Sequence, residues 1–254
     1  MKPKIGLQLY AVRDLAQEDL PGTLEKVAAL GFRAVEFPSF FGWGASAVRS
    51  HLDRLGMTAI SGFAMLDELT SRLDQTIAFI TEVGGSYVVC PWAEFADIAA
   101  IRQTAALFNR IGAACRDSDL AFCYHHHEHE FAQYDGECGL DVLLRETDPE
   151  LVKLEFDTCN AMVAGVDPVE YLTRHATRCP IVHLKDHVAG QPRGSVELGR
   201  GELDIAAAAA VAGVTGTAAD SGVKWLVVEQ ESSTLPSLES VRVARHTLVS
   251  LGIM

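Results

Sequence analysis

Short apolar runs alternate with longer amphipathic segments along nearly the whole chain. Runs rich in β-branched and aromatic residues predict strands, whereas apolar residues recurring every three or four positions predict helices. Strands are expected at residues 5–10, 33–37, 58–63, 87–90, 120–125, 152–157, 181–184 and 225–229. Helices are expected at residues 23–30, 45–55, 66–83, 93–116, 140–146, 169–175, 203–218 and 238–251.

Eight alternating strand–helix units in 254 residues predict an α/β protein with a (β/α)₈ TIM-barrel fold. No stretch reads as a linker, so residues 1–254 are expected to form a single TIM-barrel domain. A doubly wound open sheet is the rival architecture. It is disfavoured because the first strand is followed by Leu9-Tyr10-Ala11-Val12-Arg13 and not by a glycine-rich phosphate loop.

Residues able to bind metal stand at the ends of four late strands. They are His125 and His127 after the fifth strand, Asp157, His183 and Glu229. Strand alternation places His125 and His127 on one face, and His, Asp and Glu are ligands of divalent transition metals. We therefore expect one metal held by His125, Asp157, His183 and Glu229, with His127 the alternative ligand from the fifth strand. The competing interpretation is four separate polar residues where strands meet solvent.

Other polar side chains are expected around the same end of the barrel. Gln8 and Glu36 end early strands, and Lys185 shares a strand face with His183, although a solvated loop lysine is the alternative. Lys153 and Glu155 fall inside the barrel, where a buried ion pair is expected because buried charges need partners.

Three further residues are candidates for contact with a substrate. Asn160 is expected to meet a substrate hydroxyl or to cap a turn, and Trp92 to stack on a sugar face or to pack. Arg200 lies in a glycine-flanked loop that closes over the substrate or is simply flexible. His126, His129 and His187 are expected at the surface or behind the ligands.

Composition narrows the possible partners. The formal charge of −13 and a pI near 5.1 disfavour nucleic acid and acidic membrane surfaces. The six cysteines show no paired CxxC spacing, and the longest alanine-rich apolar stretch falls short of the ~20 residues that cross a bilayer. A cytoplasmic enzyme is expected, and its exposed barrel helices are compatible with a homodimer.

The motifs resemble those of the xylose isomerase-like TIM-barrel superfamily, the sugar phosphate isomerase/epimerase group. The resemblance covers nearly the whole chain. Its motifs are Gly6-Leu7-Gln8-Leu9-Tyr10-Ala11-Val12-Arg13, Tyr124-His125-His126-His127 with Glu130-Phe131, Glu155-Phe156-Asp157-Thr158-Cys159-Asn160-Ala161 with Gly165 and Asp167-Pro168, Val182-His183-Leu184-Lys185-Asp186, Glu197-Leu198-Gly199-Arg200-Gly201-Glu202-Leu203-Asp204, and Val227-Val228-Glu229-Gln230.

The resemblance implies one divalent metal ion, Mn, Mg, Co or Zn, held by Glu, Asp, His and Glu. Asp157, His183 and Glu229 are similar to the last three ligands, but His125 stands where the family has the first glutamate. In the sugar epimerases the two glutamates also form the acid/base pair. A metal-bound His125 lacks that capacity, so Glu229, Lys185 or His127 is expected to carry the proton. Inosose dehydratases look similar at this strand.

The resemblance thus implies a metal-dependent sugar or keto-sugar isomerase or epimerase acting through an enediolate. The alternatives are a metal-dependent dehydratase or lyase, similar to inosose dehydratase, that eliminates a group β to a ketone, and a non-catalytic sugar-binding barrel. The endonucleases of the superfamily that act on abasic DNA are disfavoured, because they need a cationic surface.

Overall fold

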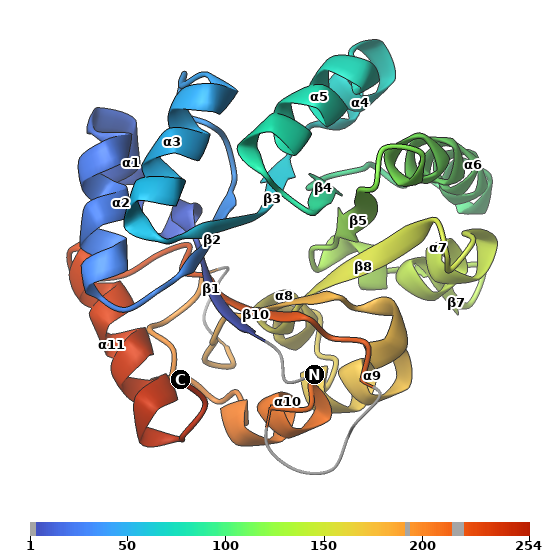
Figure 1. Cartoon of the computed structure of the whole chain (residues 1–254). Helices are drawn as coiled ribbons and strands as arrows, with labels where there is room; N and C mark the ends of the chain where they lie inside the picture. The colour runs from blue at the N-terminus through green and yellow to red at the C-terminus, as the bar shows by residue number, and fades with distance from the viewer. Residues whose placement is uncertain (1–3, 191–193, 215–220) are drawn as a thin grey trace.

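The structure is a computed structural model that describes residues 4–190, 194–214 and 221–254. Within these residues a closed barrel of parallel strands is surrounded by helices (Figure 1), which confirms the expected TIM barrel. The barrel strands are β1 (Lys4–Gln8), β2 (Ala34–Phe37), β3 (Thr58–Phe63), β4 (Tyr87–Cys90), β5 (Ala121–His125), β8 (Val152–Asp157), β9 (Ile181–Leu184) and β10 (Trp225–Val228).

The outer layer consists mainly of α-helices. They are α1 (Arg13–Glu18), α2 (Leu20–Ala29), α3 (Ala45–Leu55), α4 (Leu66–Ser71), α5 (Leu73–Val83), α6 (Ile98–Arg116), α7 (Gly139–Glu146), α8 (Thr158–Val163), α9 (Pro168–His175), α10 (Ile205–Val211) and α11 (Ser237–Ser250). Short 3₁₀ helices occupy Leu9–Val12, His129–Phe131 and Ala176–Arg178. A small hairpin, β6 (Gln133–Tyr134) and β7 (Glu137–Cys138), was not expected from the sequence.

The barrel closes because β1 pairs with β10 on one side and with β2 on the other. Each remaining strand pairs in parallel with its two neighbours around the ring. All carboxyl ends of the strands therefore open on the same side. This arrangement brings together side chains that are far apart in the sequence.

The barrel interior is filled by a compact apolar layer. It consists of Ala34, Ile60, Val89, Cys123, Ile181 and Val227. Gly6 on β1 makes room for it, since a Cβ atom at this position would lie only 2.4 Å from Cδ1 of Ile60. The polar residues at the strand ends lie above this layer.

Three predicted helices have different boundaries in the structure. The helix expected at residues 66–83 is divided into α4 and α5 at Arg72, which leaves the helical conformation at φ −142° and ψ 30°. The helix expected from residue 93 starts at Ile98, because the Asp97 side chain accepts the Ala100 N–H at 2.8 Å and caps it. The helix expected at 203–218 is α10, Ile205–Val211, and residues 215–218 lie outside the described part of the chain.

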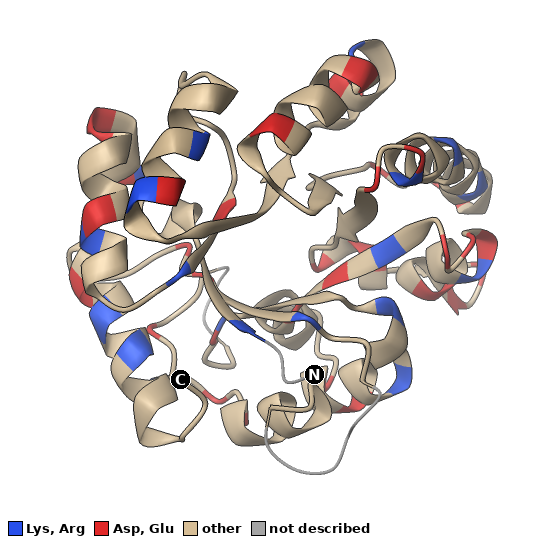
Figure 2. Cartoon of the chain, in the orientation of Figure 1, with Lys and Arg blue, Asp and Glu red and all other residues tan. Residues whose placement is uncertain are grey.

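Charged residues of both signs mark most of the outer helices in Figure 2, whereas α10 carries none. Across the residues described, no helix combines the length and apolar character needed to traverse a lipid bilayer.

The interior layer should contribute to the stability of the barrel. Ile60→Ala should lower the free energy of unfolding by about 2–5 kcal/mol, because it removes buried methylenes from a close-packed barrel. Val249→Ala is the matched control, since Val249 is 44% exposed on α11 and should change stability by less than about 0.5 kcal/mol. Urea unfolding followed by circular dichroism measures the free energy of unfolding of both variants. An equal loss of stability in Ile60→Ala and Val249→Ala would contradict this account of the core.

Candidate active site

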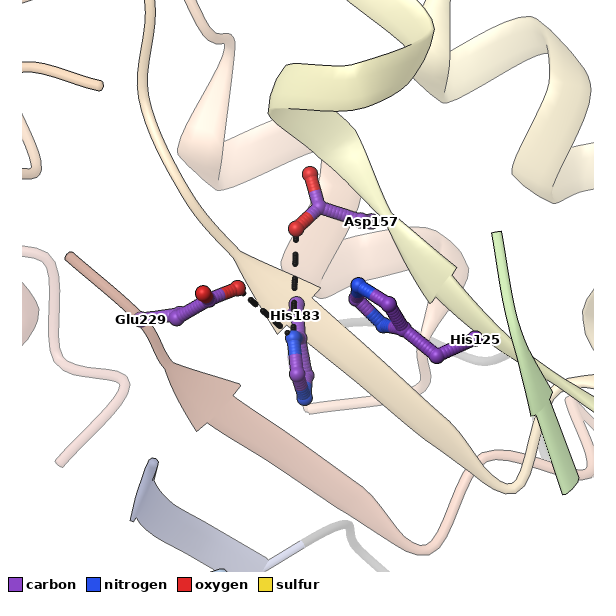
Figure 3. A group of neighbouring side chains, drawn as sticks. All are labelled: His125, Asp157, His183 and Glu229. Carbon is purple, nitrogen blue, oxygen red and sulfur yellow. Dashed lines mark hydrogen bonds and ion pairs between the residues drawn. The ribbon is translucent and has the colours of Figure 1, made fainter. Parts of the chain in front are cut away.

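Four buried side chains converge at the mouth of the barrel (Figure 3). His125 ends β5, Asp157 ends β8, His183 lies on β9 and Glu229 follows β10. Each offers one ligand atom, and these atoms all lie within 4.8 Å of one another. The structure thus brings together the four residues that the sequence selects for a metal, and it places His125 in this cluster in preference to His127.

The two oxygens of Asp157 have different surroundings. Oδ1 accepts the Asn160 N–H at 2.8 Å and so caps α8. Oδ2 has no hydrogen-bond partner among the described residues and faces His183 Nδ1 at 3.8 Å. Burial raises the pKa of Asp157 to about 7. One oxygen therefore fixes the carboxylate while the other remains available to a cation.

His183 lies between two sets of carboxylates. Its Nδ1 is 2.9 Å from Glu229 Oε2, and its Nε2 is 2.7 Å from Glu36 Oε1. Burial favours the neutral ring, but Glu155 and Glu36 outweigh burial and raise the pKa of His183 well above its usual value. If His183 were to hold a metal through Nδ1, its proton would remain on Nε2 and be donated to Glu36, the usual arrangement behind a histidine ligand.

Glu36 is itself held by neighbouring polar groups. Its Oε1 accepts from Gln8 Nε2 at 3.0 Å, and its Oε2 accepts from the Ser61 hydroxyl at 2.5 Å. Gln8, expected to contact substrate, lines the cavity, but its Oε1 also accepts the Tyr10 N–H at 3.0 Å. Gln8 therefore supports Glu36, which in turn orients His183.

The expected ion pair between Lys153 and Glu155 is wrong. Lys153 Nζ donates to the Pro149 carbonyl at 2.5 Å, whereas Glu155 is fully buried between the imidazoles of His125 and His183. His125 Nδ1 lies 3.0 Å from Glu155 Oε1 without hydrogen-bond geometry. The alternation of side chains along β8 correctly places Glu155 inside the barrel, but it does not reveal the partner.

The donor set fits a divalent transition metal. Two imidazole nitrogens and two carboxylate oxygens are typical ligands of zinc or manganese, and the buried Asp157 Oδ2 accepts no hydrogen bond from the part of the chain that the structure describes. A second group, Glu36, Glu155 and His183, shares His183 with the first. It lies behind the ligands, so we assign it to orienting His183.

A cavity of about 270 Å³ opens beside the cluster. It is lined by Gln8, Tyr10, Pro38, Phe63, Pro91, His125, His127, Lys185, Glu229 and Glu231. A larger cavity of about 930 Å³ adjoins it at Tyr10, Pro38 and Glu231 but contacts none of the four candidate ligands. We therefore place the substrate in the smaller cavity.

Lys185 reaches this cavity from the end of β9. Its Nζ lies 3.7 Å from Asp157 Oδ2, 3.5 Å from Glu229 Oε1 and 3.2 Å from Glu231 Oε2. Burial opposes its charge, but these carboxylates raise the pKa of Lys185 well above its usual value. The solvated loop lysine considered from the sequence is excluded, because the side chain is only 4% exposed.

His127 lines the cavity without joining the cluster. Its backbone N–H donates to Glu130 Oε2 at 2.9 Å, and its ring contacts Trp92 with centroids 4.7 Å apart. Burial, assisted by the charge of Lys185, lowers the pKa of His127 to about 4. The ring is therefore neutral at neutral pH, and its Nδ1 has no hydrogen-bond partner among the described residues.

The other candidates for substrate contact lie at different distances from the cluster. Trp92 and Asn160 line an adjoining cavity of about 170 Å³. Asn160 Nδ2 donates to the His126 carbonyl at 3.0 Å, so Asn160 also stabilises the local chain. Arg200 lines neither of these cavities; its half-exposed side chain lies 3.3 Å from Glu197 Oε2.

His126 stands directly behind the ligands. It is fully buried, and its Nε2 accepts the Asp157 N–H at 3.0 Å while Nδ1 faces the His127 carbonyl. Burial lowers the pKa of His126 to about 3. His129 contacts the Ala93 carbonyl and His187 the Gly194 carbonyl.

Glu231 also lines the cavity, although it was not predicted from the sequence. It follows the end of β10 by three residues and belongs to no recognisable motif.

Asp157→Asn should weaken binding of one Mn²⁺ or Zn²⁺ ion by at least about tenfold, because it removes a charged ligand but keeps an oxygen to cap α8. Asp204→Asn is the control, since Asp204 caps α10 in the same way through the Ala207 N–H at 2.8 Å. Isothermal titration calorimetry measures both. Equal metal affinity in the two variants would place the metal elsewhere.

Metal affinity should fall as the pH drops below 7. In the metal-free protein the pKa of Asp157 is about 7, so protons occupy this ligand at lower pH and compete with the metal. The raised pKa of His183 adds a second proton that the metal must displace. The dissociation constant should rise at least about tenfold per pH unit below 7. Titrations in buffers of different ionisation enthalpy count the released protons, and a constant affinity from pH 8 to 5 would contradict the assignment.

Both the sequence and the fold are similar to those of known proteins. An inosose dehydratase from Geobacillus kaustophilus is 29% identical over 203 residues, covering 66% of this chain and 65% of that protein. The chain therefore spans slightly less than two thirds of this relative's length. A sugar phosphate isomerase/epimerase from Parabacteroides distasonis superposes with a TM-score of 0.81 at 20% identity, covering 100% of this chain and 96% of the other.

The IOLI protein with a binding zinc atom has a TM-score of 0.77 at 14% identity, covering 98% of this chain and 97% of that one. At such identities these structures establish the fold alone. The family model described as a xylose isomerase-like TIM barrel matches residues 24–248, nearly the full length of the sequence. This chain therefore belongs to the xylose isomerase-like TIM-barrel family.

Proposed function

We propose that this protein is a divalent-metal-dependent enzyme that removes the proton beside the carbonyl of a keto-sugar or inosose and then eliminates water. The observation that carries this proposal is the buried cluster of His125, Asp157, His183 and Glu229 beside a cavity lined by His127 and Lys185. The sequence relative named as an inosose dehydratase supports the same class of reaction. A bound metal would supply Lewis-acid stabilisation of the oxyanion that develops on the carbonyl oxygen.

His127 is the candidate base. Its ring is neutral at neutral pH, lines the cavity and has an Nδ1 without a hydrogen-bond partner among the described residues. His125 is less suited to this role, because it is one of the four residues of the ligand cluster. His127 would take the proton from the carbon next to the carbonyl, and the Trp92 ring keeps the imidazole in place.

Lys185 is the candidate acid. The surrounding carboxylates keep its amine protonated, so at neutral pH it holds a proton and does not act as a base. In an elimination, the proton leaves carbon for His127, the β carbon–oxygen bond breaks, and Lys185 protonates the departing hydroxyl to give water. One neutral base and one charged acid match this sequence of proton transfers.

Isomerisation or epimerisation is the second candidate function. The enediolate would be the same, and the fold is shared with a sugar phosphate isomerase/epimerase. Such a reaction requires a proton to return to carbon, and the epimerase resemblance implies a pair of glutamates for it. Here the fifth strand contributes His125, so this pair is incomplete in the cluster. This difference favours elimination.

Lys185→Met should reduce kcat for dehydration of an inosose by about 10²–10⁴-fold, because it removes the proton donor for the leaving oxygen. Metal stoichiometry should stay at one equivalent, since Lys185 is not among the four ligands. Lys153→Met is the control on the neighbouring strand β8, because Lys153 bonds to the Pro149 carbonyl away from the cavity. Unchanged dehydration by Lys185→Met would exclude this role.

The reaction class is tested in D₂O with the metal-loaded enzyme and a panel of inososes and keto-sugars. Elimination should give an unsaturated or deoxy ketone detected by NMR and mass spectrometry. Recovery of an epimer or isomer with deuterium on carbon, and no loss of water, would select the second candidate. Metal and sugar binding with neither product nor exchange would identify a non-catalytic sugar-binding barrel.

A further inference from the structure

Glu231 stands where three cavities meet. It lines the cavity beside the ligand cluster, the adjoining cavity with Trp92, and the larger outer cavity. Its side chain is 51% exposed and reaches inward, so that Oε2 lies 3.2 Å from Lys185 Nζ. A ligand that enters from the outer cavity therefore passes this carboxylate.

The main chain at Glu231 is held on both sides. Arg13 donates from its guanidinium to the Glu231 carbonyl at 3.0 Å, and the Glu231 N–H donates to the Ser195 hydroxyl at 2.8 Å. Ser195 Oγ also accepts from Gln230 Nε2 at 3.3 Å and from the Ser232 N–H at 3.3 Å. The carboxylate is thus presented to the cavity from an anchored segment and not from a loose loop end.

The charges around the cavity are unfavourable for a phosphate group. In the cavity beside the ligand cluster, Lys185 is the sole cationic side chain among the described lining residues, and it already lies within 4 Å of Asp157, Glu229 and Glu231. The outer cavity adds Arg13, whose guanidinium already donates to the Tyr10 and Glu231 carbonyls. The adjoining cavity contributes a further carboxylate, Glu128. A phosphate dianion close to these groups would meet repulsion, which the low dielectric constant strengthens at the buried Glu229 and which solvent partly screens at the half-exposed Glu231.

The same lining suits an uncharged polyol. The Glu231 carboxylate accepts hydrogen bonds from hydroxyl groups, and the Tyr10 and Phe63 rings supply apolar surface for the C–H face of a sugar or cyclitol. The phosphate dianion of an ester has neither a hydrogen to donate to this carboxylate nor a C–H face to place on these rings.

We infer that Glu231 is a specificity-determining residue that admits uncharged polyol substrates to the site and excludes their phosphate esters. This inference rests on the proposed function only for the location of the substrate. It concerns the ligand's charge and not the reaction that follows.

The test is equilibrium binding of a matched pair, myo-inositol and myo-inositol 1-phosphate, to the Mn²⁺-loaded protein by calorimetry. The wild type should bind the neutral polyol at least about tenfold more tightly. Glu231→Gln should reduce this preference by about tenfold, because the carboxylate no longer repels phosphate and Lys185 loses one of its partners. Glu231→Lys should reverse it. Any contribution of direct phosphate–Mn²⁺ contact to the binding free energy is common to the wild type and the variants, so it cancels when their preferences are compared.

Glu25→Gln is the matched control, because Glu25 is an exposed carboxylate whose Oε1 pairs with Arg54 at 3.0 Å on the outer helices. It should keep the wild-type preference. Tighter binding of the phosphate ester by the wild type, an unchanged preference in Glu231→Gln, or no binding of either ligand would overturn the inference. Because no turnover is measured, a failed dehydration assay alongside the expected preference would reject the proposed reaction and leave the specificity intact.

Discussion

The site depends on the balance of charge around one buried imidazole. Glu36 and Glu155 lie near Nε2 of His183, while Asp157 and Glu229 lie near Nδ1. All four carboxyl groups are buried, and burying a carboxylate is unfavourable unless its charge is compensated. Lys185 lies within 4 Å of Asp157 and Glu229 and compensates only part of this charge. Burial accordingly raises the pKa of both Glu155 and Asp157. A divalent cation next to Nδ1 would compensate more of this charge, because two positive charges would then face the two outer carboxylates.

Much of the cluster is predictable because the barrel imposes simple geometry. Parallel strands expose their carboxyl ends on one side, so Asp157, His183 and Glu229 converge although they are separated by 72 positions at most. Strand alternation also places Glu155 inside. The residues that contact Glu155 are not predictable from the sequence of β8 alone. Lys153 donates to the Pro149 carbonyl, and His125 and His183 approach Glu155 from β5 and β9.

Loops and helix ends are less predictable than strands. The break at Arg72 and the cap at Asp97 depend on local backbone conformation that apolar periodicity does not encode. Arg200 looked suited to contact substrate because glycines flank it, yet it pairs with Glu197. Glu231 was not predicted as a cavity residue, because its position depends on contacts with Arg13 and Ser195, which are distant in the sequence.

The apolar layer of Ala34, Ile60, Val89, Cys123, Ile181 and Val227 fills the barrel beneath the polar mouth. Because Gly6 lets Ile60 approach β1 closely, the described side chains of this layer pack across the barrel axis beneath the cluster. A molecule that reaches the cluster therefore approaches from the mouth of the barrel, where three cavities meet at Glu231. A molecule bound at this mouth would obstruct both the binding and the release of other ligands. The residues at the mouth would therefore influence the dissociation rate as well as the association rate.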